Sequence, residues 1–238
     1  MVVDFHTHIL PEVDDGSASI EESLALLSAQ MQQGIQCVIA TPHFYAHHDK
    51  PERFLRRRQM AADRLRAAVG EQNGYPQIKL GAEVYFFSGM SDSESLNHLT
   101  IGEKKYILLE MPFVDWTNQF FQEMEAIYIK QGITPIIAHV DRYIRPFRTC
   151  GIPERLMDLP VLVQANASFF TKASTRRMAL RMLSRDQIHL LGSDCHNMST
   201  RKPNLGEAVE IILDRLGPEA VERINSYERT VLSNLELR

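Results

Sequence analysis

Hydrophobic positions fall into short continuous runs, separated by longer stretches with helical spacing. The runs predict strands over residues 2–5, 37–40, 78–82, 106–109, 134–138, 161–164 and 188–191. The amphipathic stretches predict helices over residues 20–33, 52–69, 118–131, 171–185 and 205–216. Continuous hydrophobicity is typical of parallel strands covered on both faces, and its alternation with helices indicates an α/β fold with a parallel sheet or barrel. About seven strands, each followed by a helix or loop, favour one barrel-like domain.

Local signals mark where several of these helices begin and end. Ser19 stands before the first helical stretch and Glu22 follows three residues later, which predicts a capping box. Gly34 and Gly132 each follow a helical stretch and precede a strand, where glycine can take the left-handed conformation. No internal repeat, low-complexity segment or long linker divides the sequence. We therefore expect residues 1–238 to form a single domain.

Composition narrows the class of protein further. Of the 238 residues, 44% are hydrophobic and 24% are charged, which argues against a disordered or fibrous chain. The net charge of -4 gives no global footprint for nucleic acid, so no such partner is expected. No apolar run approaches the ~20 residues of a membrane helix. Cys37, Cys150 and Cys195 form no CxxC pair, and the N-terminus has no signal-peptide pattern, so we expect a cytoplasmic protein.

Histidines and acids gather at the predicted carboxyl ends of the strands. His6 and His8 end the first strand and, being alternate residues, can point toward one ion. Six strand ends carry such residues, and in α/β barrels this end builds the active site. Burying imidazoles and carboxylates together is costly unless a metal compensates the charge. The candidate metal ligands are His6, His8, Asp15, His43, Glu83, Glu110, His139, Asp194 and His196.

Charge counting favours several ions over one. Asp15, Glu83, Glu110 and Asp194 carry four negative charges, so one divalent ion would leave the site at -2 and three would leave it at +2. A positive site can accept a hydroxide and a phosphate. Nine ligands also exceed one coordination sphere, and mixed imidazole and carboxylate ligands suit manganese, iron or zinc. The sequence therefore indicates a multinuclear phosphoester hydrolase.

Six motifs include the candidate ligands: DFHTHILPEVDDG at 4–16, QGIQCVIATPH at 33–43, GAEVY at 81–85, YILLEMPF at 106–113, QGITPIIAHVDRY at 131–143 and GSDCHN at 192–197. Together they resemble the PHP (polymerase and histidinol phosphatase) family and, within it, the CpsB/YwqE-type bacterial tyrosine phosphatases of capsule and exopolysaccharide operons. This resemblance implies a distorted, TIM-like (β/α)7 barrel. It implies that the nine candidate ligands bind three divalent ions, with Mn²⁺ expected and Fe or Zn as alternatives.

The resemblance also implies a substrate and a mechanism. Arg142 and Arg201 match arginines that hold the phosphate, and the metals would generate a hydroxide that attacks phosphotyrosine. Asp141 or a metal-bound water would donate the proton to the leaving group, although Asp141 stands where related phosphatases often have Glu. The implied partner is the phosphorylated, tyrosine-rich tail of a cognate tyrosine kinase that controls polysaccharide export.

Other interpretations stay open. Cys195 and Arg201 fit C-x5-R, the loop of cysteine-dependent tyrosine phosphatases, but this loop lacks glycine. The metal site could instead act on histidinol phosphate, a nucleotide or a nucleic-acid end, or it could stabilise a binding module without turnover. A run of three arginines at 56–58 reads as a solvated helix face rather than a nucleic-acid stripe, though an acidic peptide could dock there.

Overall fold

Described residues of the chain span 2–70, 74–103, 105–144 and 151–233 in the computed structural model, without the side chain of residue 103. Cys150 lies outside this part of the chain. In the described ranges, none of the helices is both long and apolar enough to cross a membrane. The expectation that residues 1–238 form a single domain stays a prediction.

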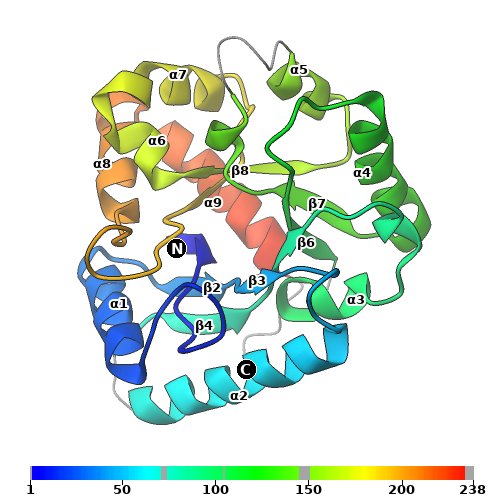
Figure 1. Cartoon of the computed structure of the whole chain (residues 1–238). Coiled ribbons are helices and arrows are strands. Elements are labelled where there is room, and N and C mark those ends of the chain that lie inside the picture. Colours follow the sequence, from blue (N-terminus) through cyan, green and yellow to red (C-terminus); the bar gives the residue numbers. More distant parts are fainter. Residues whose placement is uncertain (1, 71–73, 104, 145–150, 234–238) are drawn as a thin grey trace.

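Parallel strands form the centre of the molecule (Figure 1). One sheet contains β1 (Val3–Thr7), β2 (Cys37–Ala40) and β4 (Gln77–Leu80) in that order. The other, also in spatial order, contains β3 (His43–Phe44), β5 (Glu83–Tyr85), β6 (Tyr106–Glu110), β7 (Thr134–Ile137), β8 (Leu162–Asn166) and β9 (Leu190–Gly192). Strand β3 continues the direction of β2 after an interruption of two residues, and β5 continues β4 in the same way. If β2 with β3 and β4 with β5 are each counted as one path, the strands of the described residues follow seven paths, as the sequence predicts.

The first and last paths join and close the ring. The amide of His8 donates to the carbonyl of Cys195 at 2.9 Å, and the amide of Asp194 donates to the carbonyl of His6 at 2.8 Å. Thr7 and Cys195 form a parallel bridge beyond the end of β9. The α/β barrel class expected from the sequence is confirmed.

Helices surround the strands in Figure 1. They are α1 (Ile20–Gln32), α2 (Pro51–Val69), α3 (Leu96–Leu99), α4 (Asn118–Gln131), α5 (Ile152–Met157), α6 (Ala167–Thr171), α7 (Ala173–Ser184), α8 (Leu205–Leu216) and α9 (Pro218–Leu232), with short 3-10 turns at Met90–Asp92, Ile101–Glu103 and Val140–Arg142. The helix predicted over 171–185 corresponds to α7 alone. The extended backbone of Lys172 separates α7 from α6. Helix α9 was not predicted from the sequence.

The interior of the barrel is an apolar cluster separate from the layer under the helices. It includes Val3 and Phe5 of β1, Leu108 of β6 and Val231 of α9, all buried. Helix α9 thus packs against the inner side of the strands and crosses behind them in Figure 1. Its apolar residues close one end of the barrel, and the polar site lies at the other end.

The expected helix boundaries are present with one change of partner. The Ser19 hydroxyl accepts from the Glu22 amide at 3.2 Å, as predicted, but the Glu22 carboxylate accepts from the amide of Ala18 at 2.9 Å. Gly34 and Gly132 have φ of 76° and 65°, the left-handed conformation that lets the chain turn from helix to strand.

Candidate metal centre

The candidate ligands come from six strand paths and meet at one end of the barrel. His6 and His8 lie at the end of β1, where the register with β2 shifts between Asp4 and Thr7. Such an irregularity re-aims side chains. The remaining ligands are His43 at the start of β3, Glu83 at the start of β5, Glu110 at the end of β6, His139 after β7, and Asp194 and His196 after β9, with Asp15 in the loop after β1.

Glu83 stands at the centre of this group, almost completely buried. Its Oε2 lies 3.1 Å from Nε2 of His6, 3.3 Å from Nε2 of His8 and 3.0 Å from Nδ1 of His43. Its Oε1 lies 2.8 Å from Nε2 of His139. One carboxylate therefore faces four imidazoles that belong to three other strand paths.

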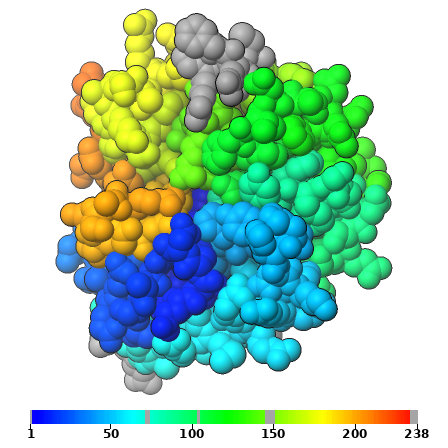
Figure 2. Space-filling model, viewed as in Figure 1, coloured from blue at the N-terminus to red at the C-terminus, as the bar shows by residue number. Residues whose placement is uncertain are grey.

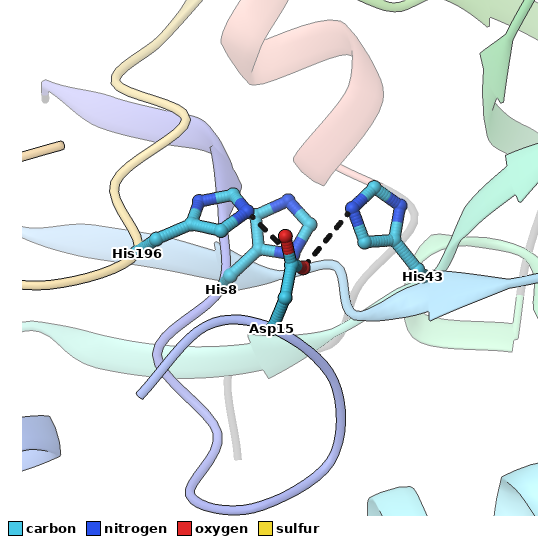
Figure 3. A group of neighbouring side chains, drawn as sticks. All are labelled: His8, Asp15, His43 and His196. Atoms are coloured by element: carbon cyan, nitrogen blue, oxygen red, sulfur yellow. Dashed lines mark ion pairs between the residues drawn. The ribbon is translucent and has the colours of Figure 1, made fainter. Parts of the chain in front are cut away.

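Ligand atoms gather in three overlapping groups, each with its members within 4.8 Å of one another. The groups are His8, Asp15, His43 and His196; His6, His8 and Asp194; and His43, Glu83 and Glu110. Figure 3 shows the first group, in which Asp15 lies 3.4 Å from His43 and 3.5 Å from His196. His139 belongs to none of these groups but lies 3.5 Å from Glu110. The structure thus brings all nine predicted ligands together, while their role as ligands stays a prediction.

Buried polar atoms in the group lack hydrogen-bond partners. Oε2 of Glu83, Nδ1 of His43 and Nε2 of His196 are buried and have ionisable groups within 3.5 Å, but no described residue meets any of them in hydrogen-bond geometry. An unpaired buried polar atom is rare and costly in a native protein. A divalent cation between them would accept these lone pairs, so the residues present fit a metal centre.

The electrostatics of the group point the same way. Burial by itself lowers the pKa of His8, but Asp14 and Glu83 outweigh it and raise that pKa to about 10. Burial also opposes the charge on His139, yet Glu110 and Glu83 raise its pKa to about 9. Nearby imidazoles hold the pKa of Glu83 well below its usual range against the effect of burial. This negative potential attracts cations, and binding them would release protons from the imidazoles.

Two of the candidate ligands have a backbone conformation that is uncommon outside glycine. His139 has φ of 32° and Asp194 has φ of 54°, both in the left-handed region. Non-glycine residues in this region are uncommon and cluster at functional sites.

Supporting residues around the ligands were missed from the sequence. Oδ2 of Asp14 lies 2.7 Å from Nδ1 of His8 and also accepts from the amide of His43 at 3.0 Å. Oε1 of Gln164 on β8 accepts from the amide of His139 at 2.6 Å. Asn166, at the end of the same strand, donates to Asp194 at 3.1 Å. In the sequence, the position of Asp14 beside Asp15 could have indicated its role. Gln164 and Asn166 could have been found as two alternate amide side chains near the end of a strand.

Of the three residues predicted for catalysis, Arg142 and Arg201 contact a candidate ligand, whereas Asp141 contacts Asn166. Arg142 pairs with Oδ2 of Asp194, and Nη2 of Arg201 donates to its Oδ1 at 2.6 Å. Each arginine side chain is about one-third exposed. Asp141 accepts from the amide of Asn166 at 2.9 Å, and burial raises its pKa. The structure therefore places both arginines beside the group, and their catalytic roles stay predictions.

Cys195 does not have the surroundings that a cysteine nucleophile needs. Its side chain is completely buried, and Nε2 of Gln30 donates to its Sγ at 3.5 Å. Burial raises the pKa of the thiol, whereas the nucleophile is the thiolate. The structure thus argues against the cysteine-dependent alternative.

Comparisons with known proteins identify relatives over nearly the whole chain. Tyrosine-protein phosphatase CpsB of Streptococcus pneumoniae is 29% identical, with 94% of each chain covered. Tyrosine-protein phosphatase YwqE of Bacillus subtilis is 27% identical, over 98% of this chain and 92% of that protein.

Solved structures give the same answer for the fold. A chain from a study of YwqE from Bacillus subtilis and CpsB from Streptococcus pneumoniae, described there as metal-dependent tyrosine phosphatases, matches with a TM-score of 0.84. It is 25% identical, and the match covers 97% of this chain and 94% of that chain. An amidohydrolase from Bifidobacterium longum, 14% identical with a TM-score of 0.53 over 98% of each chain, shares the fold alone. The model of the CpsB/CapC family of capsular polysaccharide synthesis matches residues 2–232, and the chain therefore belongs to that family.

Proposed function

We propose that this protein is a metal-dependent tyrosine-protein phosphatase that hydrolyses phosphotyrosine in a protein substrate. The observation that carries the proposal is the meeting of three candidate ligand groups, with Arg142 and Arg201 at their edge. Its relatives over nearly the full chain, named tyrosine-protein phosphatases, support the substrate. A binding module without turnover has no evident use for two arginines beside such a group.

The nine ligands hold three divalent ions in this proposal, with Mn²⁺ expected and Fe or Zn as alternatives. The three overlapping ligand groups support this number. Such ions supply a Lewis acid and lower the pKa of water toward neutrality. Glu83 would be a central residue in holding the ions, because both its oxygens face imidazoles of other candidate ligands.

The chain's own residues bind and orient the phosphate. The guanidinium groups of Arg142 and Arg201 donate to its oxygens and neutralise charge as the P–O bond breaks. Both already contact a carboxylate at the site, so their forks reach the ligand group. Asp141 is the candidate proton donor to the tyrosine oxygen; burial raises its pKa, and its Oδ1 accepts from the amide of Asn166.

The physiological substrate in this proposal is the phosphorylated, tyrosine-rich tail of a cognate bacterial tyrosine kinase. Membership of a capsular polysaccharide synthesis family supports this context. The cytoplasmic location expected from the cysteine content stays a prediction, as does the absence of a nucleic-acid partner.

One experiment tests the proposed function directly. Metals in the untagged protein are measured by elemental analysis, and turnover of a phosphotyrosyl peptide is measured before chelation, after it, and after Mn²⁺ is restored. We expect turnover that is lost on stripping and regained with the ion. Histidinol phosphate and nucleotides serve as competing substrates, and faster hydrolysis of either would overturn the assignment to phosphotyrosine.

A further inference from the structure

Two adjoining hollows lead away from the metal centre along α2. The first has a volume of about 430 Å³ and extends from Asp15 and His43 to Arg53 and Arg57. The second, of about 300 Å³, is also lined by Arg53 and Arg57 and continues to Arg64. Because Arg53 and Arg57 line both hollows, we call the two together the α2 groove. In Figure 2 the light blue segment after β2, the dark blue loop after β1 and the orange loop after β9 meet near the middle of the face.

The α2 groove follows one face of the helix. Residues 53, 56, 57, 60 and 64 recur at intervals of three and four, which places them on a single stripe. The twelve residues of helix from 53 to 64 are separated by eleven steps of about 1.5 Å, which together span about 16 Å. An extended peptide covers that length with about five residues.

The cations along this stripe are not fully neutralised. Arg57 is paired with Asp49 at 2.7 Å, and Arg64 with Glu12 at 2.8 Å. Arg53 is 80% exposed, and its Nε lies 3.9 Å from the same Asp49. Arg56 is exposed, and no ion pair to it is found within the described ranges.

The second hollow is therefore lined by four arginines and a single acid. Its lining includes Arg53, Arg56, Arg57 and Arg64, against Glu12. Next along the helix, Arg58 is buried and donates to the carbonyl of Gly81, so the arginine run of the sequence is divided between two environments.

We propose that the α2 groove binds acidic side chains that flank the phosphotyrosine of a protein substrate. This inference rests on the proposed function, because the first hollow begins at candidate metal ligands where the phosphate would be held. The segment of the substrate peptide beside the phosphotyrosine would then lie over α2, and its carboxylates would contact Arg53 and Arg56. Met60 lies between the arginines with 61% of its surface exposed, and it offers apolar contact to the aliphatic parts of the peptide's side chains.

The distribution of charge favours a peptide over a nucleic acid. Asp14 and Asp15 line the first hollow close to the metal centre, and Asp49 lines it beside Arg53 and Arg57. A nucleic acid would place a phosphate at every step of its backbone and so meet these acids. A peptide can carry its anionic groups only at the two ends of the α2 groove, at the metal centre and at the arginines.

The test compares two phosphotyrosyl peptides that differ only in having Glu or Gln at the flanking positions. Metal-loaded wild type is compared with the double variant Arg53→Gln, Arg56→Gln, both at exposed positions outside the catalytic machinery. We expect the double variant to raise KM for the Glu peptide roughly tenfold, with kcat unchanged. Its KM for the Gln peptide and for free phosphotyrosine should stay the same, and about 300 mM salt should remove the wild-type preference.

Fluorescence anisotropy gives a second readout that needs no turnover. The labelled peptides carry a non-hydrolysable phosphonate in place of phosphotyrosine, and the Kd should follow the KM. The matched control is Arg177→Gln, Arg181→Gln on α7, which makes the same charge change at exposed positions outside the groove. It should leave both constants unaltered.

The outcomes separate this inference from the proposed function. Equal Kd for the two peptides in wild type, or an unchanged Kd in the double variant, overturns the groove as an acidic-peptide site. Displacement of the Glu peptide by a short oligonucleotide more readily than by unlabelled Glu peptide overturns it in favour of nucleic acid. If wild type hydrolyses none of the substrates, the proposed function fails, and the anisotropy alone decides the groove.

Discussion

Asp14 orients His8. The carboxylate of Asp14 lies 2.7 Å from Nδ1 of the imidazole, and this contact directs Nε2 toward Glu83 and Asp194, at 3.3 and 3.5 Å. Carboxylates behind metal-binding histidines fix the tautomer and raise the basicity of the ring. His8 is a member of two of the three candidate ligand groups, so the orientation of this one ring affects both.

Substitution Asp14→Asn should weaken metal binding. The amide keeps the shape but removes the charge, so we expect metal affinity to fall about 10–100-fold. Isothermal titration of the stripped protein with Mn²⁺ measures the affinity. Asp214→Asn, at an exposed position on α8, is the matched control, and an equal effect of both substitutions would contradict the role of Asp14.

Substitution Glu83→Gln should remove the centre of the ligand group. Its carboxylate faces four imidazoles, and the amide supplies only one neutral oxygen. We expect fewer bound ions per chain by elemental analysis and a loss of turnover of at least ~100-fold. Glu94→Gln, an exposed change of the same type, should leave metal content and turnover as in wild type. Full activity of the Glu83 variant would contradict the central role of Glu83 in the ligand group.

Arg142→Lys and Arg201→Lys should separate phosphate binding from metal binding. A lysine keeps the charge but loses the planar fork that donates to two oxygens at once. We expect kcat/KM for phosphotyrosine to fall at least ~10-fold, with metal content unchanged by elemental analysis. Loss of the ions in these variants would show that the arginines act on the ligand group and not on the phosphate.

Cys195→Ser should leave the reaction almost intact. The thiol is buried, and the hydroxyl can accept the same hydrogen bond from Gln30. We expect kcat/KM within about threefold of wild type, and no inactivation of the native protein by iodoacetamide. A large loss of turnover in a variant that keeps its metals would restore the cysteine mechanism.

Glu228 should make stability depend on pH. Burial raises the pKa of this carboxyl from 4.5 to about 8, outweighing the hydrogen bond from the amide of Val3. Between these two pH values the folded protein holds a proton that the unfolded chain has released, so stability falls as pH rises through that window.

Glu228→Gln should therefore raise the melting temperature at pH ~8.5, with little effect near pH ~5, because the amide stays neutral throughout. The gain should be ~2–4 °C for each kcal/mol of penalty removed. Differential scanning calorimetry compares it with Glu219→Gln, an exposed change on the same helix. Equal shifts at both pH values would show that charge burial at Glu228 is not the cause.

Hydrophobic pattern alone predicted the fold class and brought the candidate ligands to one end of the barrel. Parallel strands all start at one end of a barrel and finish at the other. The positions of His43, Glu110 and His139 in the strand pattern were therefore enough to predict that they lie close together. The same pattern left α9 unpredicted.

Tertiary structure decided what lies between elements far apart in the sequence. Asp14 and Asp15 are neighbours in one loop, and only its folded path makes the first a support for His8 and leaves the second 65% exposed beside His43 and His196. The pairing of Arg201 with Asp194 likewise follows from a loop conformation that no periodicity encodes. Periodicity fixes which face of an element a residue occupies, whereas distances between side chains depend on how the elements pack.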